Sequence, residues 1–131
     1  MTENIAIRFS LNGRETAMDV APNAVAADIL REQCGLTSVR VSCDQAVCGV
    51  CTVLADGAPI ATCSTLAFEL DGKALTTVEG LPEGDDLLHP IQEAFRERAA
   101  FQCGYCTPGI LLSTKALLAV NPNPDRDEIR E

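Results

Sequence analysis

Residues 43–52 read Cys43-Asp44-Gln45-Ala46-Val47-Cys48-Gly49-Val50-Cys51-Thr52, and this stretch decides the fold. Its cysteines have the spacing C-x4-C-x2-C, and Cys63 follows after eleven further residues. That spacing is typical of the plant-type [2Fe–2S] centre, whose irons need four thiolates at fixed separations. A short irregular loop can supply three thiolates, and a hairpin can return the fourth. Gly49 lets the backbone approach the cluster without a Cβ, and loop amides can donate to its sulfur atoms.

Buried thiols and a zinc site are the alternatives for these cysteines. Zinc prefers two short C-x2–4-C knuckles, whereas here three cysteines lie close together and one lies apart. The spacing therefore favours a [2Fe–2S] site with the ligands Cys43, Cys48, Cys51 and Cys63. A structural zinc-binding module remains as an alternative, with an all-thiolate site at Cys48, Cys51, Cys103 and Cys106.

The segments on either side of this loop have the patterns of a small mixed sheet. Upstream, apolar alternation predicts strands over 5–11 and 16–20, joined by the hairpin signal Asn12-Gly13. A helix is expected from Asn23, as its N-cap, to about residue 34, with Gly35 ending it. Downstream, we expect a hairpin over 52–62 and a strand pair at 68–70 and 75–78. This order predicts an α+β layout, with the sheet packed over one helix.

Composition changes at residues 80–86, which contain two glycines, one proline and three acidic residues. We expect this segment to be a linker between a domain at 1–79 and a helical domain at 87–131. In the second part, His89-Pro90 opens one helix, and Thr107 with Pro108 at the first helical position opens another. Asp125 is expected to cap a third helix.

A second cysteine pair, Cys103 and Cys106, lies in a C-x2-C turn between two of these helices. Alone, this pair fits half a zinc site, half an iron–sulfur site or a thioredoxin-like redox pair. The redox pair would need a βαβ context, whereas the flanking sequence here is helical.

Taken together, four motifs resemble the small iron–sulfur subunit of the xanthine oxidase family of molybdenum hydroxylases: residues 30–32, 35–37, 43–53 and 101–109. The resemblance implies a β-grasp, ferredoxin-like domain followed by an all-α helical-bundle domain that holds a second [2Fe–2S] cluster. It implies that Cys43, Cys48, Cys51 and Cys63 ligate the cluster on the flavin side. Cys103 and Cys106 then supply half the ligands of the cluster next to molybdenum, and Gln102 approaches the pterin.

The same resemblance implies an electron-transfer subunit that makes no substrate bonds itself. Electrons would pass from a molybdopterin cytosine dinucleotide site in a large subunit, through the clusters, to FAD in a medium subunit. A stand-alone soluble ferredoxin is the alternative function. The family's second cluster takes two more ligands from a Cys-x-Cys pair that these residues lack, and only Cys34 is left over, so we expect the helical domain to be C-terminally incomplete. Ser42 and Ala46 stand where relatives usually have glycine.

Bulk composition narrows the class of protein further. Ten basic against nineteen acidic residues give a net charge of −9, and no two basic residues are adjacent, so a nucleic-acid partner is not expected. No apolar run is long enough to span a bilayer, and the first residues lack the basic region of a secretory signal. Seven cysteines, an odd number, favour metal ligation in a reducing cytoplasm over disulfides. His89 is the only histidine, and a Rieske centre needs two.

Overall fold

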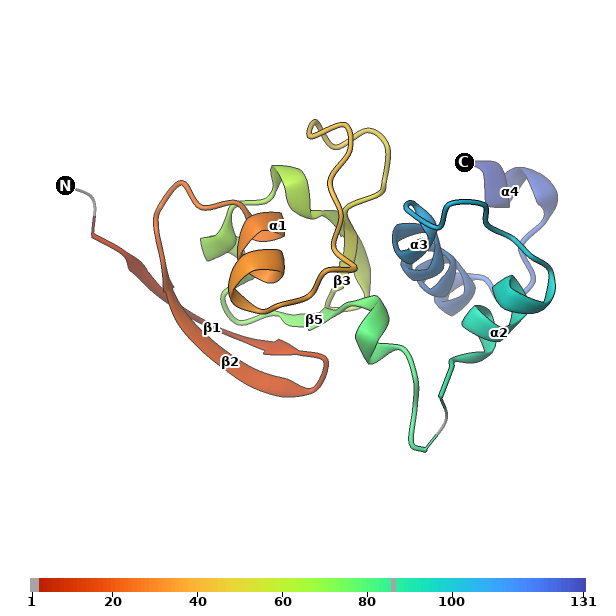
Figure 1. Ribbon diagram of the computed structural model, residues 1–131, viewed down its shortest axis with the longest axis horizontal. Helices are drawn as coiled ribbons and strands as arrows, with labels where there is room; N and C mark the ends of the chain where they lie inside the picture. The colour runs from red at the N-terminus through yellow and green to blue at the C-terminus, as the bar shows by residue number, and fades with distance from the viewer. Residues whose placement is uncertain (1–2, 86) are drawn as a thin grey trace.

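The computed structural model describes residues 3–85 and 87–131, and its first half is built on a five-stranded mixed sheet (Figure 1). The strand order is β2-β1-β5-β3-β4. The strands are β1 (Ile5–Leu11), β2 (Arg14–Val20), β3 (Thr52–Ala55), β4 (Ala58–Ala61) and β5 (Ala74–Thr76). β1 and β5 pair in parallel, whereas every other neighbouring pair is antiparallel. The mixed sheet predicted from the sequence is therefore confirmed.

Both hairpins close through the two-residue turns that their sequences indicate. Asn12 and Gly13 have φ values of 50° and 81° between β1 and β2, and Asp56 and Gly57 have 51° and 82° between β3 and β4. Two consecutive left-handed residues make the turn that matches the right-handed twist of paired strands. Thr52, the first residue of β3, follows Cys51 directly, so the second hairpin carries the chain away from the cysteine loop and back to Cys63.

The helix expected after the N-cap Asn23 begins two residues later than predicted. α1 spans Ala26–Asp28 and continues as a π-helical turn, Ile29–Gln33, before Gly35 ends it with a φ of 70°. The prediction of the N-cap was wrong because the chain ahead of α1 is held extended by a neighbouring segment. Val25 pairs with Leu66, and the amide of Ala26 donates to the carbonyl of Thr65 at 2.8 Å.

The expected strand at 68–70 is also wrong. Ala67–Leu70 is a 3₁₀ helix, because Ala67 and Leu70, three residues apart, are both buried, and the Glu69 carboxylate accepts from the Leu66 amide at 2.8 Å. Of the segment 75–78, only the part in β5 is a strand. Two further 3₁₀ turns, Thr62–Ser64 and Val78–Gly80, flank this region.

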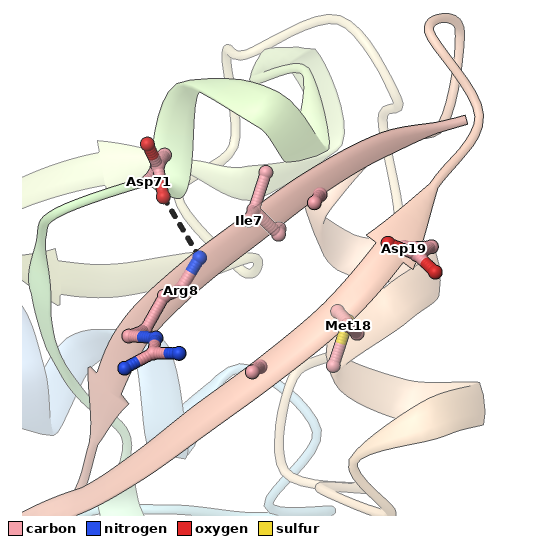
Figure 2. Close-up of a pocket in the computed structure, with 7 residues that line it drawn as sticks. Ile7, Arg8, Met18, Asp19 and Asp71 are labelled. Carbon is pink, nitrogen blue, oxygen red and sulfur yellow. Dashed lines mark hydrogen bonds between the residues drawn. The ribbon is translucent and has the colours of Figure 1, made fainter. Parts of the chain in front are cut away.

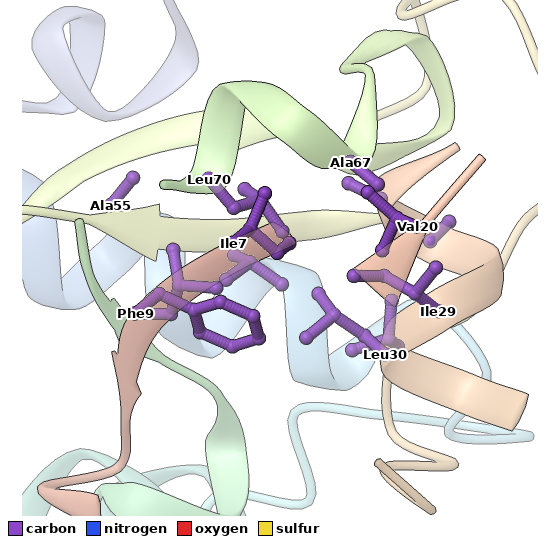
Figure 3. Close-up of a cluster of buried hydrophobic side chains, with 13 residues drawn as sticks. Ile7, Phe9, Val20, Ile29, Leu30, Ala55, Ala67 and Leu70 are labelled. Carbon is purple, nitrogen blue, oxygen red and sulfur yellow. The ribbon is translucent and has the colours of Figure 1, made fainter. Parts of the chain in front are cut away.

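The main core lies between α1 and one face of the sheet (Figure 3). Phe9 from β1 and Leu30 from the turn after α1 are 1% and 0% exposed. With a single buried aromatic residue, this core depends on close packing of branched aliphatic side chains. A second buried cluster, Leu54, Leu81, Leu111 and Leu112, joins β3 to the helices that follow.

Those helices gather beside β3, after an irregular segment that loops away from the sheet (Figure 1). They are α2 (Pro90–Glu97), α3 (Thr107–Val120) and α4 (Arg126–Arg130). His89 caps α2, since its Nδ1 accepts from the Ile91 amide at 3.1 Å, and Asp125 caps α4 as expected. α3 begins one residue earlier than expected, at Thr107, because Cys106 already has near-helical angles.

The segment expected to be a linker, 80–86, contains a buried residue, Leu81, and Asp86 lies outside the described residues. Within residues 3–85 and 87–131, no helix combines the length and apolar character needed to cross a membrane.

Candidate metal centre

The cysteine loop is held at both ends by elements of the first half. On its approach, Nη1 of Arg31 donates to the carbonyls of Val39 at 2.7 Å and Thr37 at 3.2 Å. On its exit, the chain enters β3. Cys63 returns beside it in the turn Thr62–Ser64, and the Thr62 hydroxyl donates to the Cys51 carbonyl at 2.7 Å. The hairpin therefore brings the fourth predicted ligand back to the loop, as the sequence indicates.

Backbone amides of the loop and of Cys63 donate to three of the four predicted ligand sulfurs. Sγ of Cys43 accepts from the amides of Val47 and Cys48, both at 3.4 Å. Sγ of Cys63 accepts from Ala46 at 3.4 Å, and Sγ of Cys51 accepts from Cys63 at 3.5 Å. Amide donors of this kind stabilise negative charge on thiolates and tune iron–sulfur centres. Four neighbouring cysteines, three of them with amide donors aimed at their sulfurs, therefore fit a negatively charged [2Fe–2S] cluster.

Left-handed residues turn these amides toward the sulfurs. Gly49, which the sequence singled out, has a φ of 74°, but Asp44 and Ala46 are also left-handed, at 56° and 58°. Left-handed residues alternating with right-handed ones make an anion-binding concavity of backbone N–H groups. Gly49 could be singled out from the sequence because glycine readily adopts a left-handed conformation. The side chains of Asp44 and Ala46 do not indicate that these residues are left-handed too.

The thiols of the loop differ in how readily they ionise. Hydrogen bonds from the backbone amides of Cys48, Gln45 and Val47 lower the pKa of Cys43 to about 6. Burial raises the pKa of Cys51. The thiol of Cys43 therefore ionises more readily than that of Cys51.

The second cysteine pair lies against the segment that leads into the first loop. Cys103 and Cys106 are both exposed, in the turn before α3. Nη1 of Arg40 donates to the carbonyls of Gly104 at 2.7 Å and Tyr105 at 3.1 Å. The Tyr105 hydroxyl donates in return to the Val41 carbonyl at 2.7 Å, and the Arg40 guanidinium lies 5.2 Å from the centre of the Tyr105 ring. No pattern in the sequence predicts these contacts.

A close backbone contact also joins α3 to the loop. A Cβ on Gly109 would lie 2.4 Å from the Gly49 carbonyl oxygen and 3.0 Å from that of Val50. Only glycine therefore allows α3 to approach the loop this closely. Beside this contact, an apolar groove of about 750 Å³ between α3 and α4 leaves Cys48 exposed.

The remaining predicted residues lie apart from the loop's ligand set. Gln102 is exposed next to Cys103, and Cys34 is half-buried against the main core, where burial raises the pKa of its thiol. In the described part of the chain, no three His, Cys, Asp or Glu side chains lie close enough together to hold one metal ion, and this applies equally to the cysteines of the iron–sulfur and zinc interpretations.

An open pocket of about 410 Å³ on the β1–β2 hairpin is lined by Arg8, Met18, Asp19 and their neighbours (Figure 2). The Arg8 amide donates there to Asp71 at 2.8 Å. No cysteine lines this pocket.

In the comparison with known proteins, the two groups of cysteines fall within two different family models. Residues 9–81 match the family model "2Fe-2S iron-sulfur cluster binding domain", and residues 77–131 match "[2Fe-2S] binding domain". The small subunit of nicotine 6-hydroxylase from Paenarthrobacter nicotinovorans is 42% identical over 130 residues, covering 99% of this chain and 78% of that protein. The small FeS subunit of nicotinate dehydrogenase from Eubacterium barkeri is 45% identical over 125 residues, covering 95% and 79%.

The fold agrees as well. The crystal structure of quinoline 2-oxidoreductase from Pseudomonas putida 86 aligns with a TM-score of 0.92 at 44% identity, covering 98% of this chain and 79% of that one. Both relatives quoted are subunits, which gives no support to the stand-alone ferredoxin alternative. The chain belongs to the small iron–sulfur subunits of the xanthine oxidase family of molybdenum hydroxylases.

Proposed function

We propose that this chain is the electron-transfer subunit of a molybdenum hydroxylase, carrying electrons from a molybdopterin site in a large partner subunit to FAD in a medium partner subunit. The observation that carries the proposal is the set of amide donors aimed at the sulfurs of Cys43, Cys51 and Cys63. Such donors stabilise added negative charge, which a centre that accepts an electron needs.

In this proposal Cys43, Cys48, Cys51 and Cys63 hold the first [2Fe–2S] cluster, which supplies a reversible one-electron couple when bound. The chain's own residues set the properties of that couple. The loop amides of Val47 and Cys48 donate to a ligand sulfur, and the exposed Cys48 leaves one side of the site open to solvent or a partner. Hydrogen bonds to sulfur and solvent exposure are among the factors that set the potential of an iron–sulfur centre.

Cys103 and Cys106 would hold a second [2Fe–2S] cluster, with Gln102 beside the pterin of the large subunit. The exposure of all three side chains supports a site that faces a partner. This pair supplies two of the four thiolates required. Among the described residues the remaining cysteine, Cys34, packs against the main core, so the other two ligands would come from outside residues 1–131. Seven free cysteines also suit a reducing compartment such as the cytoplasm.

The test is anaerobic purification of the chain with its partners, followed by visible spectroscopy and counts of iron and acid-labile sulfide. We expect a red-brown protein that brings molybdenum and flavin with it. Cys48→Ser should remove or distort the first cluster, while Cys34→Ser, the matched control, should leave the spectrum unchanged. An unchanged spectrum and iron content in Cys48→Ser would contradict the ligand assignment. A colourless protein that contains zinc would contradict the function itself.

A further inference from the structure

The contacts between Arg40, Val41, Gly104 and Tyr105 form a reciprocal clamp, here named the Arg40–Tyr105 clamp. The Arg40 guanidinium donates to the carbonyls of Gly104 and Tyr105, and Tyr105 donates back to the carbonyl of Val41. The guanidinium also lies over the Tyr105 ring, at a distance where a cation is attracted to an aromatic face. Both partners therefore hold each other's backbone, and neither contact depends on a flexible acidic side chain.

Both ends of the clamp lie directly beside predicted iron ligands. Arg40 and Val41 are the residues that lead, through Ser42, into Cys43. Gly104 and Tyr105 are the two residues between Cys103 and Cys106. The hydrogen bonds thus join segments 64 or 65 residues apart in the chain. The clamp therefore links the segment that leads into the first site to the turn that carries the second cysteine pair.

Among the hydrogen bonds of the described residues, only those of the clamp join the turn that holds the second pair to the first half of the chain. Phe101, Gln102, Cys103 and Cys106 are all exposed, and the buried leucines that anchor α3, Leu111 and Leu112, come after the turn. The contact of Gly109 with the carbonyl of Gly49 fixes the start of α3, but it also follows the turn. The clamp is therefore the contact that reaches back to the turn itself.

We propose that Arg40 and Tyr105 are positioning residues that fix the separation between the two [2Fe–2S] sites, an inference that rests on the proposed function. Electron transfer between two centres weakens steeply as their separation grows, so a turn free to move would make the coupling between them variable. The clamp keeps the turn at one distance from the first loop. In this role Arg40 and Tyr105 do not ligate iron, and neither side chain gains or loses a proton.

The experiment measures the magnetic coupling between the two clusters in the purified, full-length complex. When both clusters are reduced, each carries an unpaired spin, and the splitting of the electron paramagnetic resonance signals falls with the cube of the distance between them. Arg40→Met removes both hydrogen bonds and the cation over the ring but keeps an unbranched side chain. Tyr105→Phe removes the hydroxyl alone, and Arg40→Lys keeps a cation that can still donate to a carbonyl.

Arg14→Met is the control, since it makes the same substitution at an exposed arginine of β2, away from both cysteine segments. We expect loss or broadening of the splitting in Arg40→Met, a smaller loss in Tyr105→Phe, and recovery in Arg40→Lys. Arg14→Met should keep the wild-type splitting at equal iron content.

The outcomes separate this proposal from the function on which it rests. Unchanged splitting in Arg40→Met, with iron for both clusters present, overturns the positioning role and leaves the proposed function intact. If Arg40→Met loses iron, the test rests on Tyr105→Phe, which keeps the aromatic ring and removes a single hydrogen bond. Unchanged splitting in Tyr105→Phe would then overturn the positioning role. If the wild-type complex contains iron for just one cluster, the assignment of a second cluster is wrong, and the positioning role is wrong with it.

Discussion

Ala46 carries a backbone conformation that its side chain does not favour. Its φ is 58°, and its amide must keep that orientation to donate to Sγ of Cys63. A Cβ in the left-handed region costs roughly 1–2 kcal/mol, whereas glycine adopts this region freely. The loop therefore includes local strain at a position where the family resemblance leads one to expect glycine.

We expect Ala46→Gly to raise the free energy of unfolding by about 0.5–1 kcal/mol, because relief of the strain outweighs the greater chain entropy of glycine in the unfolded state. Chemical denaturation of the iron-loaded protein measures the change. The control is Ala61→Gly at the end of β4, where φ is −89° and glycine should destabilise by roughly 0.5–1 kcal/mol. Equal effects of the two substitutions would contradict the role given to the left-handed conformation.

At the scale of elements, α3 is the helix on which the position of the second half depends. Its first turn touches the cysteine loop through Gly109, and its next residues, Leu111 and Leu112, are buried against β3 and the segment that contains Leu81. The helix cannot withdraw from the loop without exposing these leucines. A change at the contact must therefore move the loop, the helix or both.

Gly109→Ala should lower the free energy of unfolding by about 1–3 kcal/mol, the usual cost of overpacking, since the added Cβ meets backbone that cannot rotate away. We also expect a changed visible circular dichroism spectrum, because the carbonyl that it strikes belongs to Gly49, next to Cys48. Ser113→Ala, at an exposed position of the same helix, serves as the control. Wild-type stability and spectrum in Gly109→Ala would show that the loop does not need this close approach.

At the scale of the whole molecule, a shared apolar cluster makes the two halves depend on each other. Leu54 comes from the sheet, Leu81 from the connecting segment, and Leu111 and Leu112 from α3. Halves joined by buried apolar side chains move less freely than domains tied by a linker alone. We therefore expect heat to unfold the iron-loaded chain in one cooperative transition.

Leu112→Ala tests this dependence, because its side chain is 2% exposed at the junction. Removing it should cost about 2–5 kcal/mol and lower the midpoint of the whole transition in calorimetry. Val120→Ala on the same helix, where the side chain is 87% exposed, should change the midpoint little. A separate early transition confined to the helices, with the sheet unaffected, would contradict the dependence.

Apolar alternation and turn chemistry were enough to predict a mixed sheet and both of its hairpins, and the cysteine spacing predicts an iron site in the loop before the second hairpin. C-x4-C-x2-C has few other uses, and Asn12-Gly13 allows only a narrow set of turns. The errors fell where tertiary contacts overrode local preference. Asn23 is a good cap by itself, but pairing of Val25 with Leu66 keeps the chain extended beyond it. Phe68 favours a strand, yet burial of Ala67 and Leu70 selects a 3₁₀ turn.

The Arg40–Tyr105 clamp and the Gly109 contact could not be predicted from one sequence. Each joins residues far apart in the chain, and arginine, tyrosine and glycine are common in loops for many reasons. Only the spatial meeting of the two cysteine segments gives these residues a shared role.

The parallel pairing of β1 with β5 has a kinetic consequence for how the chain folds. The hairpins β1–β2 and β3–β4 join neighbours in the chain and can form within microseconds, about 1–10 μs for an isolated hairpin. β5 pairs with β1 and β3 only after most of the first half has been brought together, and such non-local pairing is slow. The four predicted ligands of the first cluster all precede β5 in the chain. During synthesis they therefore leave the ribosome before the strand that closes the sheet.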